Sequence, residues 1–373
     1  MLFRSLAGET VSQLGFGAMR LPTVDGAVDV AGTVRMLRHA IDNGVNYIDT
    51  AWPYHGGESE GVVGKALKDG YRDRTFVATK SPVWLMKKPA DFDRYLDLQL
   101  ERLDTDRIDF YLLHALGSGS WETCQRLDAL DFLDRARTAG KIRHAGFSFH
   151  DELPAFKRIV DEGSWEFCQI QYNYLDRAFQ AGQEGLEYAK ARGIDVIVME
   201  PLRGGSLARG VPPTVQALWD SAAVRRTPAE WALRWIWDRP EVSLILSGMG
   251  AIEQVDENLR TASEAAAGGL AADERALVDA AEVAYKGETR IDCTACRYCM
   301  PCPSGVDIPR NFAQYNSYFM FMQDPMVKAD YRWIPEDERA NVCTECGNCE
   351  ELCPQQLPIK EHLKTVAATF AGA

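Results

Sequence analysis

Short apolar runs alternate with amphipathic, charged stretches along the first 262 residues of the chain. This alternation is typical of repeated strand–helix units and hence of a parallel sheet. Eight units in about 260 residues predict an α/β fold of the closed (β/α)8 barrel (TIM barrel) type, because open doubly wound sheets normally use fewer strands. The expected strands are residues 14–19, 45–50, 75–80, 108–114, 144–149, 167–173, 194–200 and 242–248. No GxGxxG motif follows the first run, which argues against a Rossmann domain.

The pattern changes after Asn258. The Ala-rich stretch 261–285 predicts a helix, a Gly-Gly break and a second helix. Eight of the ten cysteines lie beyond it within 61 residues, with one expected helix over 308–324. We therefore expect a barrel over residues 1–262, a helical linker over 263–286 and a small, mainly helical domain over 287–373.

The eight clustered cysteines form two runs with triplet spacing, each ending in Cys-Pro. One tight loop can wrap three corners of an iron–sulfur cubane, but the fourth ligand must come from elsewhere in the chain. Two zinc sites with four cysteine ligands each are the alternative, although zinc sites seldom use three consecutive triplet-spaced cysteines. Disulfides are disfavoured in a chain without an export signal. We expect Cys124 and Cys168, outside the runs, to be small core residues.

The two runs resemble those of bacterial-type ferredoxins with two [4Fe-4S] clusters, in which the fourth cysteine of each run ligates the other cluster. Forty residues separate Cys302 from Cys343, so a helical connection would replace the compact ferredoxin hairpins. The resemblance implies one cluster held by Cys293, Cys296, Cys299 and Cys353, and another held by Cys343, Cys346, Cys349 and Cys302.

Several expected strands carry a polar or ionisable residue at their ends, among them Asp49, Lys80 and His114. Because the carboxyl ends of barrel strands form the catalytic face, these side chains should converge there, with Tyr54 on the loop after Asp49. A nearby ammonium would favour the phenolate of Tyr54, and Asp49 would hold that ammonium in place. A neutral His114 could donate a hydrogen bond to a carbonyl oxygen. The four residues therefore predict an acid–base site.

Residues 1 to about 260 resemble the aldo/keto reductase family, and four segments carry the resemblance: YIDTAWPYHGGESEGVVGKAL (47–67), FVATK (76–80), DFYLLH (109–114) and VDENL (255–259). The resemblance implies hydride transfer between a nicotinamide cofactor, NADP(H) or NAD(H), and a small carbonyl or alcohol substrate. Tyr54 would be the general acid, with Lys80 and Asp49 tuning it and His114 orienting the substrate.

The resemblance also implies cofactor contacts. Ser148 and Gln169 would bind the nicotinamide carboxamide, whereas the family's usual Asn is replaced by Phe149, which is followed by His150. Met199 stands where an aromatic residue normally stacks on the ring, so its thioether would face the ring instead.

The loops after the last two strands should bind pyrophosphate through backbone N–H groups. The residues in question are Pro201, Leu202, Arg203, Gly204, Ser247 and Gly248. Glu257 and Asn258 match the family's adenine-contacting pair. The basic positions for the 2′-phosphate of NADP read Gly248 and Gln254, which leaves the choice between NADP and NAD open. One alternative is that Arg203 or Arg209 serves as a substitute cation, although loop arginines are more often solvent-exposed.

Trp52, His55 and Trp84 follow the second and third strands. They either wall the substrate pocket or pack between helices. The sequence favours neither alternative.

The chain carries a formal net charge of −13, which repels phosphate backbones and anionic lipid surfaces. Nucleic acid is therefore not an expected partner. No run of about 18 apolar residues indicates a membrane span, and the N-terminus lacks the apolar region of a signal peptide. We expect a cytoplasmic protein.

A hydride carries two electrons, and dividing them between one-electron clusters normally requires a flavin, for which the sequence shows no pattern. The favoured interpretation is a carbonyl–alcohol oxidoreductase whose clusters are structural, regulatory or connected to an external redox protein. One alternative is an electron-transfer enzyme acting on an unconventional substrate. Another is a non-enzymatic redox sensor.

Overall fold

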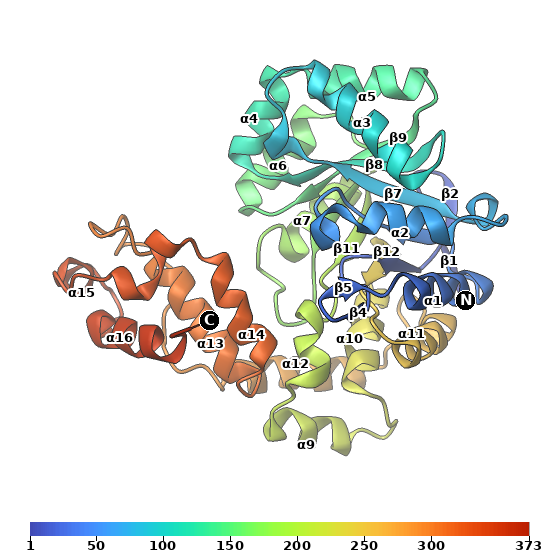
Figure 1. The fold of residues 1–373 in the computed structure, drawn as a ribbon. Helices are drawn as coiled ribbons and strands as arrows, with labels where there is room; N and C mark the ends of the chain where they lie inside the picture. The colour runs from blue at the N-terminus through green and yellow to red at the C-terminus, as the bar shows by residue number, and fades with distance from the viewer. Residues whose placement is uncertain (373) are drawn as a thin grey trace. The chain divides into compact units, whose positions relative to one another are not determined.

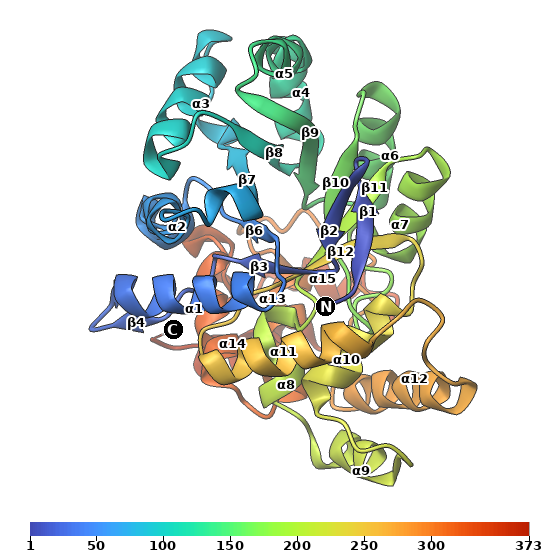
Figure 2. The ribbon, with the colours of Figure 1, turned by 90° about the vertical axis from the view of Figure 1, so that its right-hand side faces the viewer.

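Eight parallel strands close into a barrel in the computed structural model, which describes residues 1–372. Each strand pairs with its neighbours in chain order, and the last returns to the first. Figure 2 shows β3, β6, β7, β8 and β9 side by side. All eight expected strands are confirmed, as β3 (Leu14–Gly17), β6 (Tyr47–Asp49), β7 (Phe76–Ser81), β8 (Ile108–Leu116), β9 (Ile142–Phe149), β10 (Phe167–Gln171), β11 (Asp195–Met199) and β12 (Val242–Ser247).

Helices outside the barrel explain why these strands are continuous apolar runs. Parallel strands covered on both faces lose the alternation of polar and apolar residues, and all six residues of β12 are indeed buried. In α10, Trp231, Trp235 and Trp237 are buried as well. The helices that accompany the barrel strands, several of which are labelled in Figure 1, are α1 (Val30–Asp42), α2 (Ser59–Ala66), α3 (Ala90–Leu103), α4 (Ser118–Arg126), α5 (Ala129–Thr138), α6 (Leu153–Glu162), α7 (Gly182–Ala191), α10 (Pro228–Trp237) and α11 (Ile252–Glu264).

A β-hairpin that the sequence analysis did not predict closes the amino-terminal end of the barrel. Its strands, β1 (Phe3–Leu6) and β2 (Glu9–Ser12), pair antiparallel. Leu6 and Val11 are fully buried in one cluster with Tyr47, Phe110 and other residues of the barrel interior. The opposite end of the barrel is therefore left for chemistry. A second short pair, β4 (Thr23–Val24) and β5 (Ala27–Val28), precedes α1.

The chain forms two compact units. The first comprises residues 1–204 and 230–271, and the second comprises 205–229 and 272–373. The sequence did not indicate that residues 205–229 group with the C-terminal part. The finer boundaries expected at residues 262 and 286 stay a prediction. Helices of the second unit are α8 (Ser206–Arg209), α9 (Pro213–Ser221), α12 (Ala272–Lys286), α13 (Ile308–Met320), α14 (Pro325–Ala329), α15 (Asn348–Glu351) and α16 (Ile359–Thr369).

The second unit has its own apolar core, which α13 and α16 supply in large part. Phe312, Leu363 and Phe370 are buried there, and the rings of Tyr331 and Phe370 stack 4.2 Å apart. Six of the eight clustered cysteines pack against this core while remaining partly exposed. The core therefore supports the cysteine loops through these packing contacts.

Candidate active site and iron–sulfur sites

The carboxyl ends of β6 and β7 bring a lysine and an aspartate into contact inside the barrel. Lys80 Nζ donates hydrogen bonds to Asp49 Oδ1 at 2.6 Å and to the carbonyl oxygen of Thr50 at 2.8 Å. Both charged side chains are buried. Tyr54 lies in the short 3-10 turn Tyr54–Gly57, and its hydroxyl is 3.5 Å from Lys80 Nζ. Every residue type has a backbone carbonyl, so the sequence pattern does not predict the hydrogen bond to Thr50.

His114 from β8 completes the group. Its ring centroid lies 6.1 Å from that of Tyr54 in an edge-on arrangement. Burial, reinforced by the positive charge of Lys80, holds the pKa of His114 well below its usual range, so the imidazole is neutral near pH 7. Within residues 1–372, no side chain or backbone group pairs with the buried Nδ1 of His114. A neutral ring with an unpaired polar nitrogen suits a bound carbonyl oxygen.

The pKa of Tyr54 corrects one expectation from the sequence. Lys80 does favour the phenolate, but burial outweighs it, and the pKa of Tyr54 is raised above its ordinary value. Burial alone would lower the pKa of Lys80, but the interactions with Asp49 and Tyr54 outweigh burial and raise it. The site therefore holds a protonated phenol beside a protonated amine.

Three residues expected to contact nicotinamide come together on neighbouring strands. Ser148 and Gln169 face each other in the register of β9 and β10, and Gln169 Nε2 donates to Met199 Sδ at 3.3 Å. Ser148 Oγ accepts a hydrogen bond from the backbone N–H of Ala115. The buried Oε1 of Gln169 has no partner within residues 1–372. Because an unpaired buried acceptor is costly, this oxygen fits a donor such as a carboxamide N–H.

Phe149 does not replace the missing carboxamide contact. Its side chain is buried, and its ring centroid lies 5.1 Å from that of Phe156, whereas His150 is exposed. The position that is usually Asn therefore contributes to packing in this chain.

The expected phosphate-side residues occupy the loops after β11 and β12. Asn258 Nδ2 donates to Ser247 Oγ at 3.0 Å, and the side-chain oxygen of Gln254 accepts from the backbone of Gly250. Arg203 Nε lies 3.4 Å from a carboxylate oxygen of Asp176. In the first unit, Pro201, Leu202, Gly204 and Gly248 shape these loops, and Glu257 lies on α11 one residue before Asn258. In the second unit, Arg209 pairs with Asp324 at 3.5 Å.

Of the three candidate substrate residues, Trp84 is the one whose ring contacts His114. Its ring lies 5.2 Å from that of His114, and its side chain is 53% exposed. The Arg102 guanidinium lies over the ring of Trp52, with its central carbon 3.5 Å from the ring centroid. His55 Nε2 accepts a hydrogen bond from the backbone N–H of Leu21 at 3.0 Å. These two residues therefore stabilise the loops around the site.

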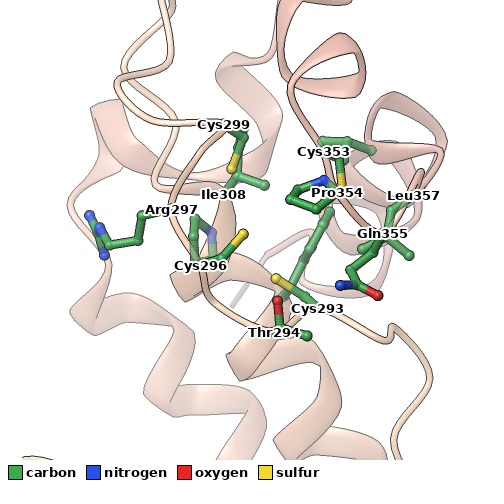
Figure 3. Close-up of a pocket in the computed structure, with 13 residues that line it drawn as sticks. Cys293, Thr294, Cys296, Arg297, Cys299, Ile308, Cys353, Pro354, Gln355 and Leu357 are labelled. Atoms are coloured by element: carbon green, nitrogen blue, oxygen red, sulfur yellow. The ribbon is translucent and has the colours of Figure 1, made fainter.

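Four cysteines line one pocket in the second unit. Three come from the first run and one from the end of the second run, and their sulfur atoms turn toward a common space (Figure 3): Cys293, Cys296, Cys299 and Cys353. The empty volume is about 330 Å³, including space open to solvent. This is the set that the ferredoxin resemblance implies for one cluster, and four thiols around one cavity fit a [4Fe-4S] cubane.

The second expected ligand set consists of Cys302, Cys343, Cys346 and Cys349, which are partly or fully exposed. Burial, together with the charges of Glu350, Cys302 and Cys343, raises the pKa of the Cys349 thiol to about 11. Cys346 is exposed. No three His, Cys, Asp or Glu side chains of residues 1–372 converge as they would on a single metal ion. In a cubane each thiolate binds a different corner, so its ligands surround a cavity and do not meet at one point.

The closed barrel and the polar strand ends define the class of this protein, a barrel oxidoreductase with cysteine loops appended. A model of the aldo/keto reductase family matches residues 13–267, and a model of a 4Fe-4S dicluster domain matches residues 292–363. The chain therefore belongs to the aldo/keto reductase family of NAD(P)-dependent oxidoreductases, and it carries a C-terminal 4Fe-4S dicluster domain.

Characterised relatives cover most of the barrel. L-galactose dehydrogenase of Arabidopsis thaliana is 29% identical over 69% of this chain and 86% of its own length. The NADH-specific methylglyoxal reductase of Escherichia coli is 28% identical over 67% and 89%. The holo form of aldo-keto reductase AKR11C1 from Bacillus halodurans superposes with a TM-score of 0.64 at 28% identity, over 75% of this chain and 96% of that one.

A solved aldo/keto reductase from Klebsiella pneumoniae, in complex with NADP and acetate, is 26% identical, with a TM-score of 0.60 over 73% of this chain and 92% of its own.

Among residues 1–372, no helix combines the length and the apolar character that crossing a bilayer requires.

Proposed function

We propose that the barrel interconverts a small carbonyl compound and its alcohol by hydride transfer with a nicotinamide cofactor. The observation that carries this proposal is the group formed by Tyr54, Lys80, Asp49 and His114 at the carboxyl ends of the strands. Each side chain can serve a separate need of carbonyl reduction, and the four come from the adjacent strands β6, β7 and β8 and from the turn after β6.

In the reducing direction, a bound nicotinamide cofactor would supply a hydride to the carbonyl carbon. Tyr54 donates its phenolic proton to the carbonyl oxygen, and the ammonium of Lys80 stabilises the phenolate that remains. Asp49 keeps Lys80 protonated and in place. The neutral imidazole of His114 donates a hydrogen bond to the same oxygen and fixes its orientation.

Ser148, Gln169 and Met199 would hold the nicotinamide ring against this group. Two relatives suggest that both nicotinamides should be tested: the E. coli reductase is NADH-specific by name, and the Klebsiella structure holds NADP. The E. coli reductase and the Arabidopsis dehydrogenase support substrates of the size of methylglyoxal or a sugar.

We further propose that the second unit holds two [4Fe-4S] clusters with the ligand sets given above. Because the clusters exchange single electrons, they stand outside the hydride step. They serve a structural or regulatory role or relay electrons to an external redox protein.

Replacement of Tyr54 by Phe tests the proposal directly. Anaerobically purified protein should oxidise NADPH or NADH with an aldehyde while cluster absorbance stays constant. Tyr54→Phe should lower turnover about a hundredfold or more, because it removes the proton donor. Tyr71→Phe is the matched control, since that hydroxyl bonds to Asp42 away from the site.

Other outcomes would favour other functions. Equal turnover in wild type and Tyr54→Phe would reject Tyr54 as the acid. Bleaching of the clusters during turnover, with activity lost in Cys346→Ser, would indicate an electron-transfer enzyme. Nicotinamide binding without turnover on any carbonyl would indicate a redox sensor.

A further inference from the structure

Neither of the expected phosphate-binding loops, both within the described residues, contains a basic side chain that is not already close to a carboxylate. The first, around Gly204, contains Arg203, but this guanidinium is already close to the Asp176 carboxylate. The second, residues 247–251, contains no lysine or arginine. A dinucleotide pyrophosphate carries two negative charges, which backbone N–H groups alone would have to neutralise.

Arg20 reaches both loops from the segment that follows β3, the strand that pairs with β12. A Cβ built on Gly248 would lie 3.3 Å from Cβ and Cδ of Arg20. A Cβ built on Gly204 would lie 2.9 Å from Nη2 of the same arginine. The Arg20 side chain therefore passes through space that a side chain at position 248 would take, and its guanidinium reaches the loop after β11.

The Arg20 guanidinium has no competing partner in the part of the chain that the structure describes. Within residues 1–372, it forms no ion pair and no side-chain hydrogen bond. A carboxylate oxygen of Glu200 lies 3.8 Å from the Cβ position of Gly204, and within residues 1–372 no ion pair joins Glu200 to Arg20. Arg20 is half-buried, so a bound anion would be partly shielded from water. This combination distinguishes Arg20 from Arg203.

We propose that Arg20 binds the pyrophosphate of the nicotinamide dinucleotide between the loops after β11 and β12. A guanidinium presents parallel N–H donors that match two phosphate oxygens, and such charge-assisted pairs are stronger than neutral hydrogen bonds. The proposal rests on the proposed function, because it needs a dinucleotide in the barrel. It adds a side-chain cation to the backbone N–H groups of the two loops.

The test is direct binding of NADPH and NADH, followed by nucleotide fluorescence without substrate, to the intact anaerobic protein. Arg20→Gln should weaken the binding of both nucleotides about tenfold to a hundredfold, because both carry the pyrophosphate. Its binding should also depend less on ionic strength than that of wild type. Arg20→Lys, which keeps the charge but not the paired donors, should fall between. Arg35→Gln on the exposed surface of α1 is the control with the same loss of charge.

The outcomes separate this proposal from the function on which it rests. If wild type binds neither nucleotide, the proposed function itself fails. If wild type binds and Arg20→Gln binds equally well, only the role of Arg20 is overturned. Weakened binding of NADPH alone would also overturn the pyrophosphate assignment, because it would place Arg20 at the 2′-phosphate.

Discussion

Lys80 and Asp49 form an ion pair in the barrel interior, where neither side chain meets solvent. Removing one partner of such a pair leaves a buried charge without compensation, which typically costs about 3–5 kcal/mol. We therefore expect Asp49→Leu to lower the free energy of unfolding by that order, measured by urea denaturation. The double variant Asp49→Leu/Lys80→Met should recover much of the loss while remaining inactive.

This comparison separates stability from chemistry at the residue scale. If the single and double variants were equally unstable, the ion pair would not be the cause. Activity in the double variant would contradict the proposed roles of both residues.

The second prediction at the residue scale concerns His114 and the pH dependence of stability. Its pKa in the folded protein lies well below the ordinary value of 6.5, so the unfolded chain binds this proton first as pH falls. Stability should then decrease below about pH 6.5, by at most about 1.4 kcal/mol per pH unit for one group. His114→Asn should show a shallower loss between pH 7 and pH 5 in chemical denaturation. Parallel pH profiles for the two proteins would refute this origin.

At the scale of elements, the hairpin of β1 and β2 seals the end of the barrel that is opposite the reactive residues. Leu6 is fully buried beneath it, whereas Phe3 on the same strand is 48% exposed. Leu6→Ala should cost about 2–5 kcal/mol through a cavity, and Phe3→Ala should cost much less. Turnover below the unfolding transition should be unchanged in both, measured by steady-state kinetics. A fall in turnover for Leu6→Ala would mean that the hairpin also shapes the active end.

The strands of the barrel and this hairpin differ in how well sequence predicts them. A barrel strand is buried on both faces, so β12 appears as an unbroken apolar run. The hairpin strands have four residues each, and their turn places Ala7 and Gly8 at positive φ where Asn-Gly would be the familiar signal. The pattern was therefore too short and its turn too unusual to predict the hairpin.

At the scale of the whole molecule, the cysteine sets predict the iron content. Two [4Fe-4S] clusters require about eight iron and eight sulfide per chain. Cys353→Ser should lose about four of each, because this thiol lines the pocket with the first run. Cys124→Ala, which removes a buried cysteine on α4, should keep all of them. Iron and sulfide assays on anaerobic protein measure this, and zinc in place of iron would refute the cluster assignment.

Residue types and their spacing by themselves determined the strand count, the candidate acid–base residues and the cysteine runs, because burial and ligand chemistry restrict which residues can occupy such positions. Only the tertiary structure decided which candidates meet. Trp84 reaches His114 while Trp52 packs on Arg102, and Arg20 crosses to loops that lie far along the chain, around Gly204 and Gly248. These outcomes depend on side-chain direction and on contacts between distant segments, which a linear pattern does not encode.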